Sequence, residues 1–267
     1  MSPATPVTML TFGPMIDSEL SRLVLWRYGL PFREERHIFG WVSILALLRG
    51  GTGRIPLIYA HGVRLNGPRA VIDRYELLCE PGQILIPATQ PLRTRVEDDW
   101  IKFNGDLATH TARIAYFHLL PRRELLLDPF ERGIPPVEAR ITPALYPALR
   151  ELFTLLLRLY PKVISDSVDH AKRIVDEVDY RVADGRRFLH GEAVTLSDFS
   201  FATAAAPMML PDGYTSPFPC YDQLPPKMKL IVDSFRERPS SALVGRVYGL
   251  RALPEADSVS LGDTQSL

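Results

Sequence analysis

The stretch Val194-Thr195-Leu196-Ser197-Asp198-Phe199 carries the strongest local structural signal in the chain. Thr195 and Asp198 have the spacing of a capping box, in which each side chain bonds the backbone N–H at the other position. The valine and the phenylalanine at the two ends can pack together across the first helical turn. The stretch therefore predicts a helix that begins at Leu196. Capping satisfies backbone amides that a first turn leaves unpaired, so a structural role is sufficient to explain these residues.

Most of the chain around this stretch has helical patterning, with apolar residues at three- and four-residue spacing. The predicted helices are 95–119, 143–160, 163–184, 196–206, 226–236 and 240–248. Residues 95–251 are therefore expected to form an all-helical domain. The last residues, 252–267, are small and polar, which predicts a disordered tail.

The first part of the chain alternates between strand and helix patterning. Strands are predicted over 7–11, 32–37, 55–59 and 63–65, and helices over 18–28 and 69–78. Pro56 stands at the start of a strand, where a missing backbone N–H does least harm. Residues 1–80 are therefore expected to form an α+β domain of order βαβ-ββα, a small mixed sheet with helices packed against it. The proline-rich segment 81–94 is expected to be a linker.

Composition and charge limit the classes of function. The 267 residues are 46% hydrophobic, and 31 Lys plus Arg balance 31 Asp plus Glu. A net charge of zero removes the long-range attraction that nonspecific nucleic-acid binders and acidic-membrane binders use. No apolar run approaches the roughly 18 residues of a membrane span, and the N-terminus lacks the pattern of a secretory signal. We expect a soluble, cytoplasmic protein that binds neither nucleic acid nor membrane.

The metal-ligating residue types do not gather in a recognisable motif. Cys79 and Cys220 are too far apart in the sequence for a redox pair or a cysteine zinc site. Asp106 and His110 are four residues apart on a predicted helix, as are Asp166 and His170, a spacing at which a metal could bridge each pair. Surface ion pairs are the simpler interpretation of this spacing. No metal site is therefore predicted.

Taken together, these features resemble the cytosolic glutathione transferase superfamily. The resemblance rests on the βαβ-ββα unit with an Ile55-Pro56 step before its third strand, the proline-rich linker, and Gly191 followed by the capping stretch in a helical domain. It covers about Val7 to Tyr248. It implies a thioredoxin-like first domain that binds glutathione, a second domain that binds an electrophile, a cis peptide bond before Pro56, and a homodimer.

The resemblance also implies a catalytic residue. Ser18 begins the stretch Ser-Glu-Leu-Ser-Arg-Leu-Val, which occupies the place of the family's active residue, although the usual proline is Glu19. A thiol with an ordinary pKa of about 8.5 is mostly protonated at neutral pH, whereas the reaction needs the thiolate. A hydroxyl at a helix N-terminus can bond that anion, helped by the helix dipole. On the residues alone, Ser18 is better explained as a helix cap, and the resemblance brings the two interpretations close to equal.

The resemblance further implies two sets of binding residues. The glutathione-binding set is Ile55, Pro56, Gly67, Pro68 and Arg69. Gly67 and Pro68 stand where the family usually has an acidic residue or Gln followed by Ser. The hydrophobic pocket set, on the first helix of the second domain, is Trp100, Phe103, Asn104, His110 and Arg113. Aromatic residues at helical spacing are more often core than pocket.

The expected function is that of a glutathione transferase-like enzyme, which conjugates or transfers the glutathione thiolate to a hydrophobic electrophile, as in detoxification. Glutathione would be the cosubstrate. The alternative is a noncatalytic protein that holds an apolar or acidic ligand on the same scaffold, with an altered or lost glutathione site, because fold alone does not grant function. Dithiol redox chemistry is disfavoured, because no cysteine stands at position 18 or 21.

Overall fold

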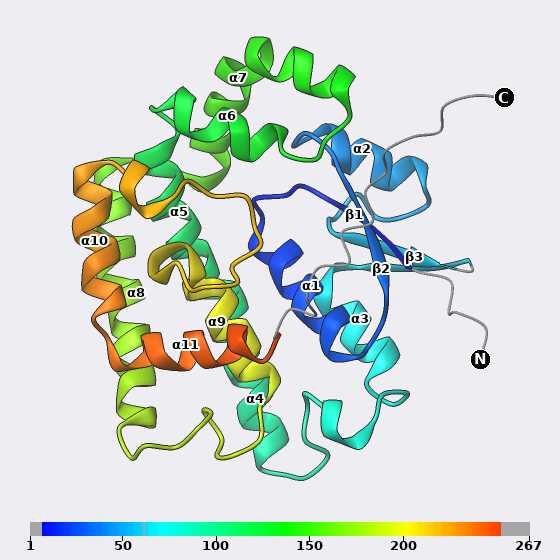
Figure 1. The fold of residues 1–267 in the computed structure, drawn as a ribbon, viewed down its shortest axis with the longest axis vertical. Coiled ribbons are helices and arrows are strands. Elements are labelled where there is room, and N and C mark those ends of the chain that lie inside the picture. The colour runs from blue at the N-terminus through cyan, green and yellow to red at the C-terminus, as the bar shows by residue number, and fades with distance from the viewer. Residues whose placement is uncertain (1–6, 61, 252–267) are drawn as a thin grey trace, which may run out of the picture.

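The N-terminal part of the computed structural model is a four-stranded mixed sheet with helices against it (Figure 1). The structure describes residues 7–60 and 62–251, so the tail expected over 252–267 lies outside the described residues. The strands are β1 (Val7–Thr11), β2 (Phe32–Arg36), β3 (Leu57–Ala60) and β4 (Val63–Asn66), in the order β2-β1-β3-β4. β1 and β2 run parallel, and the other two pairs are antiparallel.

Three helices accompany this sheet: α1 (Ile16–Arg27), α2 (Trp41–Leu48) and α3 (Gly67–Tyr75). The predicted βαβ-ββα order is confirmed, but α2 between β2 and β3 was not predicted. Only Val42 and Ala46 of α2 are buried, and its apolar residues surround the helix instead of forming one stripe. Because the amphipathic period is missing, the sequence pattern gave no helix there.

The rest of the described chain is helical, as predicted (Figure 1). A first long helical stretch consists of α4 (Leu92–Trp100), a π-helical segment (Ile101–Leu107) and α5 (Ala108–Leu119). The others are α6 (Arg123–Glu131), α7 (Pro136–Leu157), α8 (Pro161–Val182), α9 (Leu196–Met209), α10 (Pro226–Arg236) and α11 (Pro239–Gly249). Short 3-10 turns lie at Pro81–Gln83 and Tyr221–Gln223.

Two of these helices differ from the prediction. α6 was not predicted, and α7 begins at Pro136, earlier than the predicted residue 143. Proline removes a backbone donor and usually ends a helix, which is why Pro143 was taken as a start. In the structure Pro143 and Pro147 both lie inside α7. Tertiary packing has overridden the local preference at these positions.

α9 is the centre of the helical part, because every residue from Leu196 to Met209 is buried. Its start is the predicted one: Asp198 Oδ2 accepts the Thr195 N–H at 2.8 Å. The second carboxylate oxygen accepts the Leu189 N–H at 2.7 Å, which ties the preceding loop to the same cap. Small and apolar residues on all sides let this helix lie between other helices and against α1.

A buried ion-pair cluster joins the two parts of the chain. Arg22 on α1 contacts Glu19 and Glu34, each at 2.7 Å. Arg22 also donates to the Ser216 hydroxyl at 3.0 Å, and Glu19 accepts from the backbone and hydroxyl of Thr215. Residues 215 and 216 belong to the segment between α9 and α10. The cluster therefore holds α1 in a fixed position against the helical part.

Candidate functional site

Three segments meet at one end of the sheet. β1 ends at Thr11, just before the loop that leads into α1. Leu10 pairs with Leu57, so the cis peptide bond between Ile55 and Pro56 lies beside the end of β1. The Pro56 carbonyl accepts the N–H of Gly67 at 2.8 Å, which brings the start of α3 to the same place. The predicted cis bond is confirmed, and the sheet register explains why these segments are neighbours.

A cavity of about 250 Å³ lies where α1 begins, between the sheet and the helical part. It is largely apolar, with Asp17 and Asn104 as its polar side chains together with the hydroxyls of Thr109 and Tyr116. The residues that line it are Phe12, Pro14, Met15, Ile16, Asp17, Phe39, Asn104, Ala108, Thr109, Ala112, Tyr116, Phe153, Leu156 and Leu157. A concave, mostly apolar surface with few polar groups is the usual form of a small-molecule site.

Aromatic rings build one wall of this cavity. The Tyr116 and Phe153 rings stack with their centroids 4.7 Å apart, and Phe39 lies 4.7 Å from Phe153. The Tyr116 hydroxyl donates to the Pro14 carbonyl at 3.2 Å, which fixes the loop before α1 against α5. The wall is therefore held in place from both parts of the chain, and the cavity depends on their relative position.

One sequence pattern marks the side of the cavity that α5 forms, and the prediction did not use it. Asn104, Ala108, Ala112 and Tyr116 recur at every fourth position, and all four line the cavity. Residues four apart lie on the same face of a helix. Two alanines in such a series leave room for a cavity beside the helix. The prediction instead assigned the pocket to larger aromatic residues.

The structure places the predicted pocket residues mostly elsewhere. Of that set, only Asn104 lines the cavity. Phe103 is buried and packs its ring edge-on against Phe201 at 5.3 Å, and Trp100 packs on the core. His110 stacks on His170, with ring centroids 4.3 Å apart. Arg113 donates to the carbonyl of Leu157 at 2.9 Å, so it supports the cavity wall from behind.

Ser18 is the third residue of α1, and its side chain is fully buried. Its hydroxyl donates to the carbonyl oxygen of Phe12 at 3.1 Å. The helix cap is Met15, so Ser18 is not the N-cap that the residues alone suggested. Ser18 does not line the cavity; Asp17 does. The hydroxyl that the resemblance assigns to the thiolate therefore serves the β1–α1 loop.

Asp17 is the ionisable group at the polar end of the cavity. Burial raises the pKa of its carboxyl above the ordinary value of 3.8, and a hydrogen bond with Asn104 opposes that rise. Glu19, two residues on, turns away and pairs with Arg22. The N-terminal end of α1 therefore presents one carboxyl to the cavity, beside the unpaired backbone amides and the positive end of the helix dipole.

The predicted glutathione-binding residues lie close together, but the side chain of Arg69 is turned toward the protein's own carboxylates. Ile55 and Pro56 meet Gly67 and Pro68 at the start of α3. Gly67 has a φ of 82°, which favours glycine, yet a Cβ there would meet no atom within 4 Å. The Arg69 guanidinium is held by Asp73 and Glu97. Arg69 is therefore already neutralised by the protein's own carboxylates.

Two further features bear on ligand classes. Among residues 7–60 and 62–251, no group of three or more His, Cys, Asp or Glu residues has a geometry that could hold a metal ion. In the same residues neither Asp106 with His110 nor Asp166 with His170 forms an ion pair; His170 instead contacts Arg173 at 3.1 Å. The expected surface ion pairs are absent there. None of the described helices combines the length and apolar character needed to cross a bilayer.

The sheet domain, the helical domain and the cavity between them define a class of two-domain protein with a thioredoxin-like first part. The chain has the fold of the cytosolic glutathione transferase superfamily. No protein-family model matches the chain, and no curated protein is similar enough in sequence to count as a match. The assignment therefore rests on structure.

Three solved structures illustrate the likeness. A glutathione S-transferase from Rhodospirillum rubrum F11 is 17% identical, with a TM-score of 0.53 over 89% of this chain and 91% of that one. FzlA from C. crescentus is 16% identical, with a TM-score of 0.53 over 94% and 95%. The β-etherase LigF from a Sphingobium species is 12% identical, with a TM-score of 0.57 over 92% and 100%. Identities this low establish the fold alone.

Proposed function

We propose that the protein is a glutathione transferase-like enzyme that transfers the glutathione sulfur to an apolar electrophile. The electrophile would occupy the cavity between the two domains. The thiolate would lie against the start of α1, and the backbone around cis-Pro56 would pair with the peptide. The structural likeness to glutathione transferases and to a β-etherase supports this reading.

The observation that carries the proposal is the position of the apolar cavity at the N-terminal end of α1. Unpaired amides and the helix dipole favour a negative charge at such an end. A thiolate held there needs no side-chain hydroxyl, so the buried position of Ser18 does not remove the chemistry. The sulfur attacks the electrophilic carbon, the thioether bond forms, and the leaving group departs with the electron pair. Positioning and thiolate stabilisation supply the catalysis.

A second candidate is a noncatalytic binding protein on the same scaffold. The start of α3 favours it, because Gly67 and Pro68 offer no side-chain group to the γ-glutamyl end of the tripeptide. Arg69 is paired with Asp73 and Glu97 and does not compensate. In this reading the cavity holds an apolar ligand and glutathione binds weakly or not at all.

Calorimetric titration with glutathione, followed by turnover of 1-chloro-2,4-dinitrobenzene, distinguishes the two candidates. The enzyme should bind glutathione and form the thioether. Ala112→Phe, which fills the cavity, should then abolish turnover while glutathione still binds. Ala148→Phe on the exposed face of α7 is the matched control and should leave turnover unchanged. No heat at millimolar glutathione and no turnover would reject the enzyme and support the binding protein.

The start of α3 offers an independent test. Gly67→Gln combined with Pro68→Ser supplies the side chains that the resemblance expects at these positions. A Cβ at position 67 meets open space, although a φ of 82° costs about 1–2 kcal/mol for a residue other than glycine. Glutathione should bind the double variant severalfold more tightly than the native chain. Unchanged affinity would show that the tripeptide does not reach α3.

The homodimer and the cytoplasmic location belong to the same proposal. Light scattering with size-exclusion chromatography is expected to give twice the 30.1 kDa mass of the chain. A monomer at micromolar concentration would remove the dimer from the proposal without affecting the cavity.

A further inference from the structure

The short helix α2 exposes apolar side chains to an unusual degree. It carries no charged residue over Trp41–Leu48, and only Val42 and Ala46 are buried. Its large exposed apolar side chains, with exposed fractions from 44% to 74%, are Trp41, Ile44, Leu47 and Leu48. Single exposed leucines are ordinary on a protein surface, whereas a contiguous apolar patch marks an interaction surface. Four such side chains on one eight-residue helix form a patch of this kind.

A stripe of apolar residues on α7 adds to this patch. Figure 1 shows α2 and α7 at the same end of the molecule. Exposed apolar residues recur along α7 at three-, four- and seven-residue intervals, which places them on one side of the helix: Val137, Ile141, Leu145, Leu152 and Leu155. Glu138, three residues before Ile141, accepts the N–H of Ile38 at 2.9 Å. The loop that leads into α2 is therefore fixed beside the stripe.

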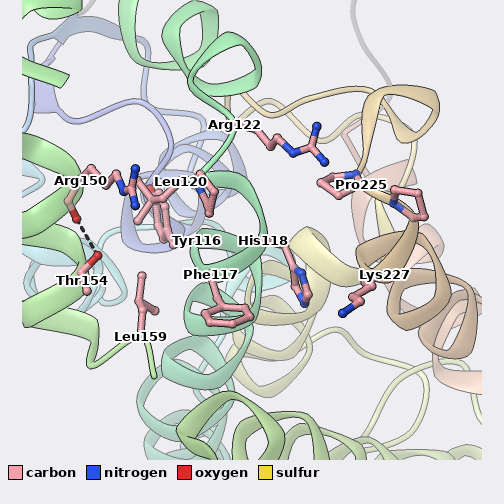
Figure 2. Close-up of a pocket in the computed structure, with 12 residues that line it drawn as sticks. Tyr116, Phe117, His118, Leu120, Arg122, Arg150, Thr154, Leu159, Pro225 and Lys227 are labelled. Carbon is pink, nitrogen blue, oxygen red and sulfur yellow. Dashed lines mark hydrogen bonds between the residues drawn. The ribbon is translucent and has the colours of Figure 1, made fainter. Parts of the chain in front are cut away.

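The opposite side of α7 faces a different part of the molecule. Arg150 and Thr154 line a cavity of about 630 Å³ together with the end of α5 and the start of α10 (Figure 2). On a helix these two positions are offset by about half a turn from Ile141 and Leu145. The stripe therefore does not open into that cavity. The exposed apolar residues of α2 and of the stripe are together called the α2–α7 face.

The charges that surround α2 are of one sign. Residues 37–72 contain four arginines and neither Asp nor Glu. Arg49 and Arg69 pair with carboxylates outside this segment. Arg54 and Arg64 are exposed, and neither forms an ion pair with a carboxylate that the structure describes. Arg64 also donates to the Arg49 carbonyl at the end of α2, which places a cation beside the exposed leucines.

We propose that the α2–α7 face lies on the surface of an anionic lipid bilayer. Trp41 and the leucines of α2 would enter the headgroup layer, where apolar and amphipathic side chains are favoured. Arg54 and Arg64 would lie at the lipid phosphates, which guanidinium groups bind well. Eight helical residues are about 12 Å long, too short to cross a bilayer, so the contact is with its surface. The inference does not depend on the proposed enzyme activity.

The zero net charge of the chain does not oppose this contact. Salt screens charges beyond about 10 Å at 0.1 M, so a bilayer responds to the face that touches it and not to the sum over the chain. The expectation of no membrane partner was drawn from that sum. A second copy of the chain fits the face less well. Pairing two such faces would bring Arg54 and Arg64 of both copies together, with no carboxylate from residues 37–72 to oppose them.

Vesicle cosedimentation of the full chain tests the requirement for lipid charge. One set of vesicles is pure phosphatidylcholine, and in the other phosphatidylglycerol replaces about a third of the lipid. We expect at least tenfold tighter binding to the anionic vesicles, and loss of this difference in high salt. Equal binding to the two sets, or no binding at millimolar lipid, would overturn the proposal.

Apolar substitutions test the location. Trp41→Ser combined with Leu48→Ser should weaken binding to the anionic vesicles at least tenfold, because both side chains would leave water in the complex. Ile141→Ser combined with Leu145→Ser tests the stripe on α7 and should weaken it severalfold. Leu230→Ser on α10, where the leucine is 72% exposed, is the matched control and should have no effect. Native affinity in both double variants would refute the assignment of the face.

Charge substitutions test the second component. Arg54→Gln and Arg64→Gln should each weaken binding to the anionic vesicles about fivefold and leave the weak binding to phosphatidylcholine unchanged. Arg95→Gln, an exposed cation on α4, is the control and should bind as the native chain does. An equal loss in Arg95→Gln would show a nonspecific charge effect and count against the proposal. Thermal unfolding of each variant checks that these exposed substitutions leave the fold intact.

Trp41 reports directly on the contact. Trp26→Phe and Trp100→Phe leave Trp41 as the one tryptophan of the chain's three. Its emission should shift to shorter wavelength on anionic vesicles and be quenched by brominated lipid. Unchanged emission from bound protein would place the contact elsewhere. Light scattering covers the other occupant: if Trp41→Ser with Leu48→Ser turns a dimer into a monomer and the native chain binds no vesicles, the face belongs to a second copy and the proposal fails.

Discussion

The Ser18 hydroxyl donates to the Phe12 carbonyl oxygen at 3.1 Å, and both residues are buried between β1 and α1. Ser18→Ala leaves that carbonyl without its donor, which should lower the free energy of unfolding by about 1–2 kcal/mol. Because the hydroxyl does not face the cavity, turnover with glutathione should fall by less than about threefold. Chemical denaturation and steady-state kinetics measure the two effects.

Ser18→Cys is the matched control, since it retains a side-chain donor, although the thiol donates more weakly than the hydroxyl. A hundredfold loss of turnover in Ser18→Ala with unchanged stability would contradict this expectation. That result would return the thiolate-stabilising role to the Ser18 hydroxyl.

Asp17 is a half-buried residue at the edge of the cavity, and the raised pKa of its carboxyl makes a pH-dependent prediction. The folded state holds the proton more tightly than the unfolded state, so the proton stabilises the fold below pH 3.8. This contribution is lost as the pH rises through the raised value. Asp17→Asn should therefore be more stable than the native chain at neutral pH, by about 1–2 kcal/mol.

Urea unfolding between pH 3 and pH 8 tests this sign. The gain in Asp17→Asn should grow with pH, whereas Asp212→Asn at an exposed site should show no trend. A variant less stable than the native chain at neutral pH would mean that the charged carboxylate is satisfied by donors of the helix end.

Arg22 neutralises two carboxylates at once, so its removal should be costly. Arg22→Leu leaves the buried Glu19 without its cation and leaves Glu34 with Arg36 alone, which should lower the free energy of unfolding by about 3–5 kcal/mol. Arg33→Leu, exposed on the same strand as Glu34, should change it by less than about 0.5 kcal/mol. Guanidinium denaturation of both variants gives the comparison.

The ion pair between Arg22 and Glu34 predicts that acid destabilises the fold. Burial alone would raise the pKa of Glu34, but the hydrogen bonds and charge of Arg22 outweigh it and lower that pKa to about 2. A depressed carboxyl pKa stabilises the fold above the ordinary value of 4.5, and this contribution is lost as the pH falls toward 2. The deficit of Arg22→Leu should therefore shrink below pH 4.5. A constant deficit would mean that packing, and not charge, holds the cluster.

Asp198 holds two separate backbone N–H groups, those of Thr195 and Leu189. Asp198→Ala should therefore cost about 2–4 kcal/mol, more than the loss of an ordinary helix cap. Glu192→Ala, an exposed carboxylate in the same loop, should be close to neutral. Thermal unfolding ranks the two, and equal effects would show that the capping contacts contribute little.

The sequence predicted the elements whose patterns are local. The capping stretch sets the start of α9 because its hydrogen bonds span only three residues. The βαβ-ββα order followed from periodicity and from Pro56. The same reasoning missed α2 and began α7 too late, because an exposed apolar helix has no amphipathic period and Pro143 normally breaks a helix.

The candidate site was less accessible to sequence reasoning. The prediction placed Ser18 correctly at the start of α1. Neighbouring residues on a helix point in different directions, however, and it is the Asp17 side chain that lines the cavity. Phe103 and Trp100 were taken for pocket residues because size and aromaticity mark core and pocket alike. Only the packing of α5 on α8 and α9 shows which face remains open.

By itself, then, the sequence determined the fold class and the start of α9, because both depend on local patterns of residues. The cis bond at Pro56 was expected from the resemblance to a family, and the structure has it. Tertiary structure decided which groups are free to act. In the sequence, Ser18 and Arg69 look free to bind a ligand. In the structure, the Ser18 hydroxyl donates to the Phe12 carbonyl and Arg69 pairs with Glu97. The helices α2 and α7 are distant in the chain, and only folding brings their exposed apolar residues to the same end of the molecule. Hydrogen bonds and charges act over a few ångströms, and only the folded chain sets those distances.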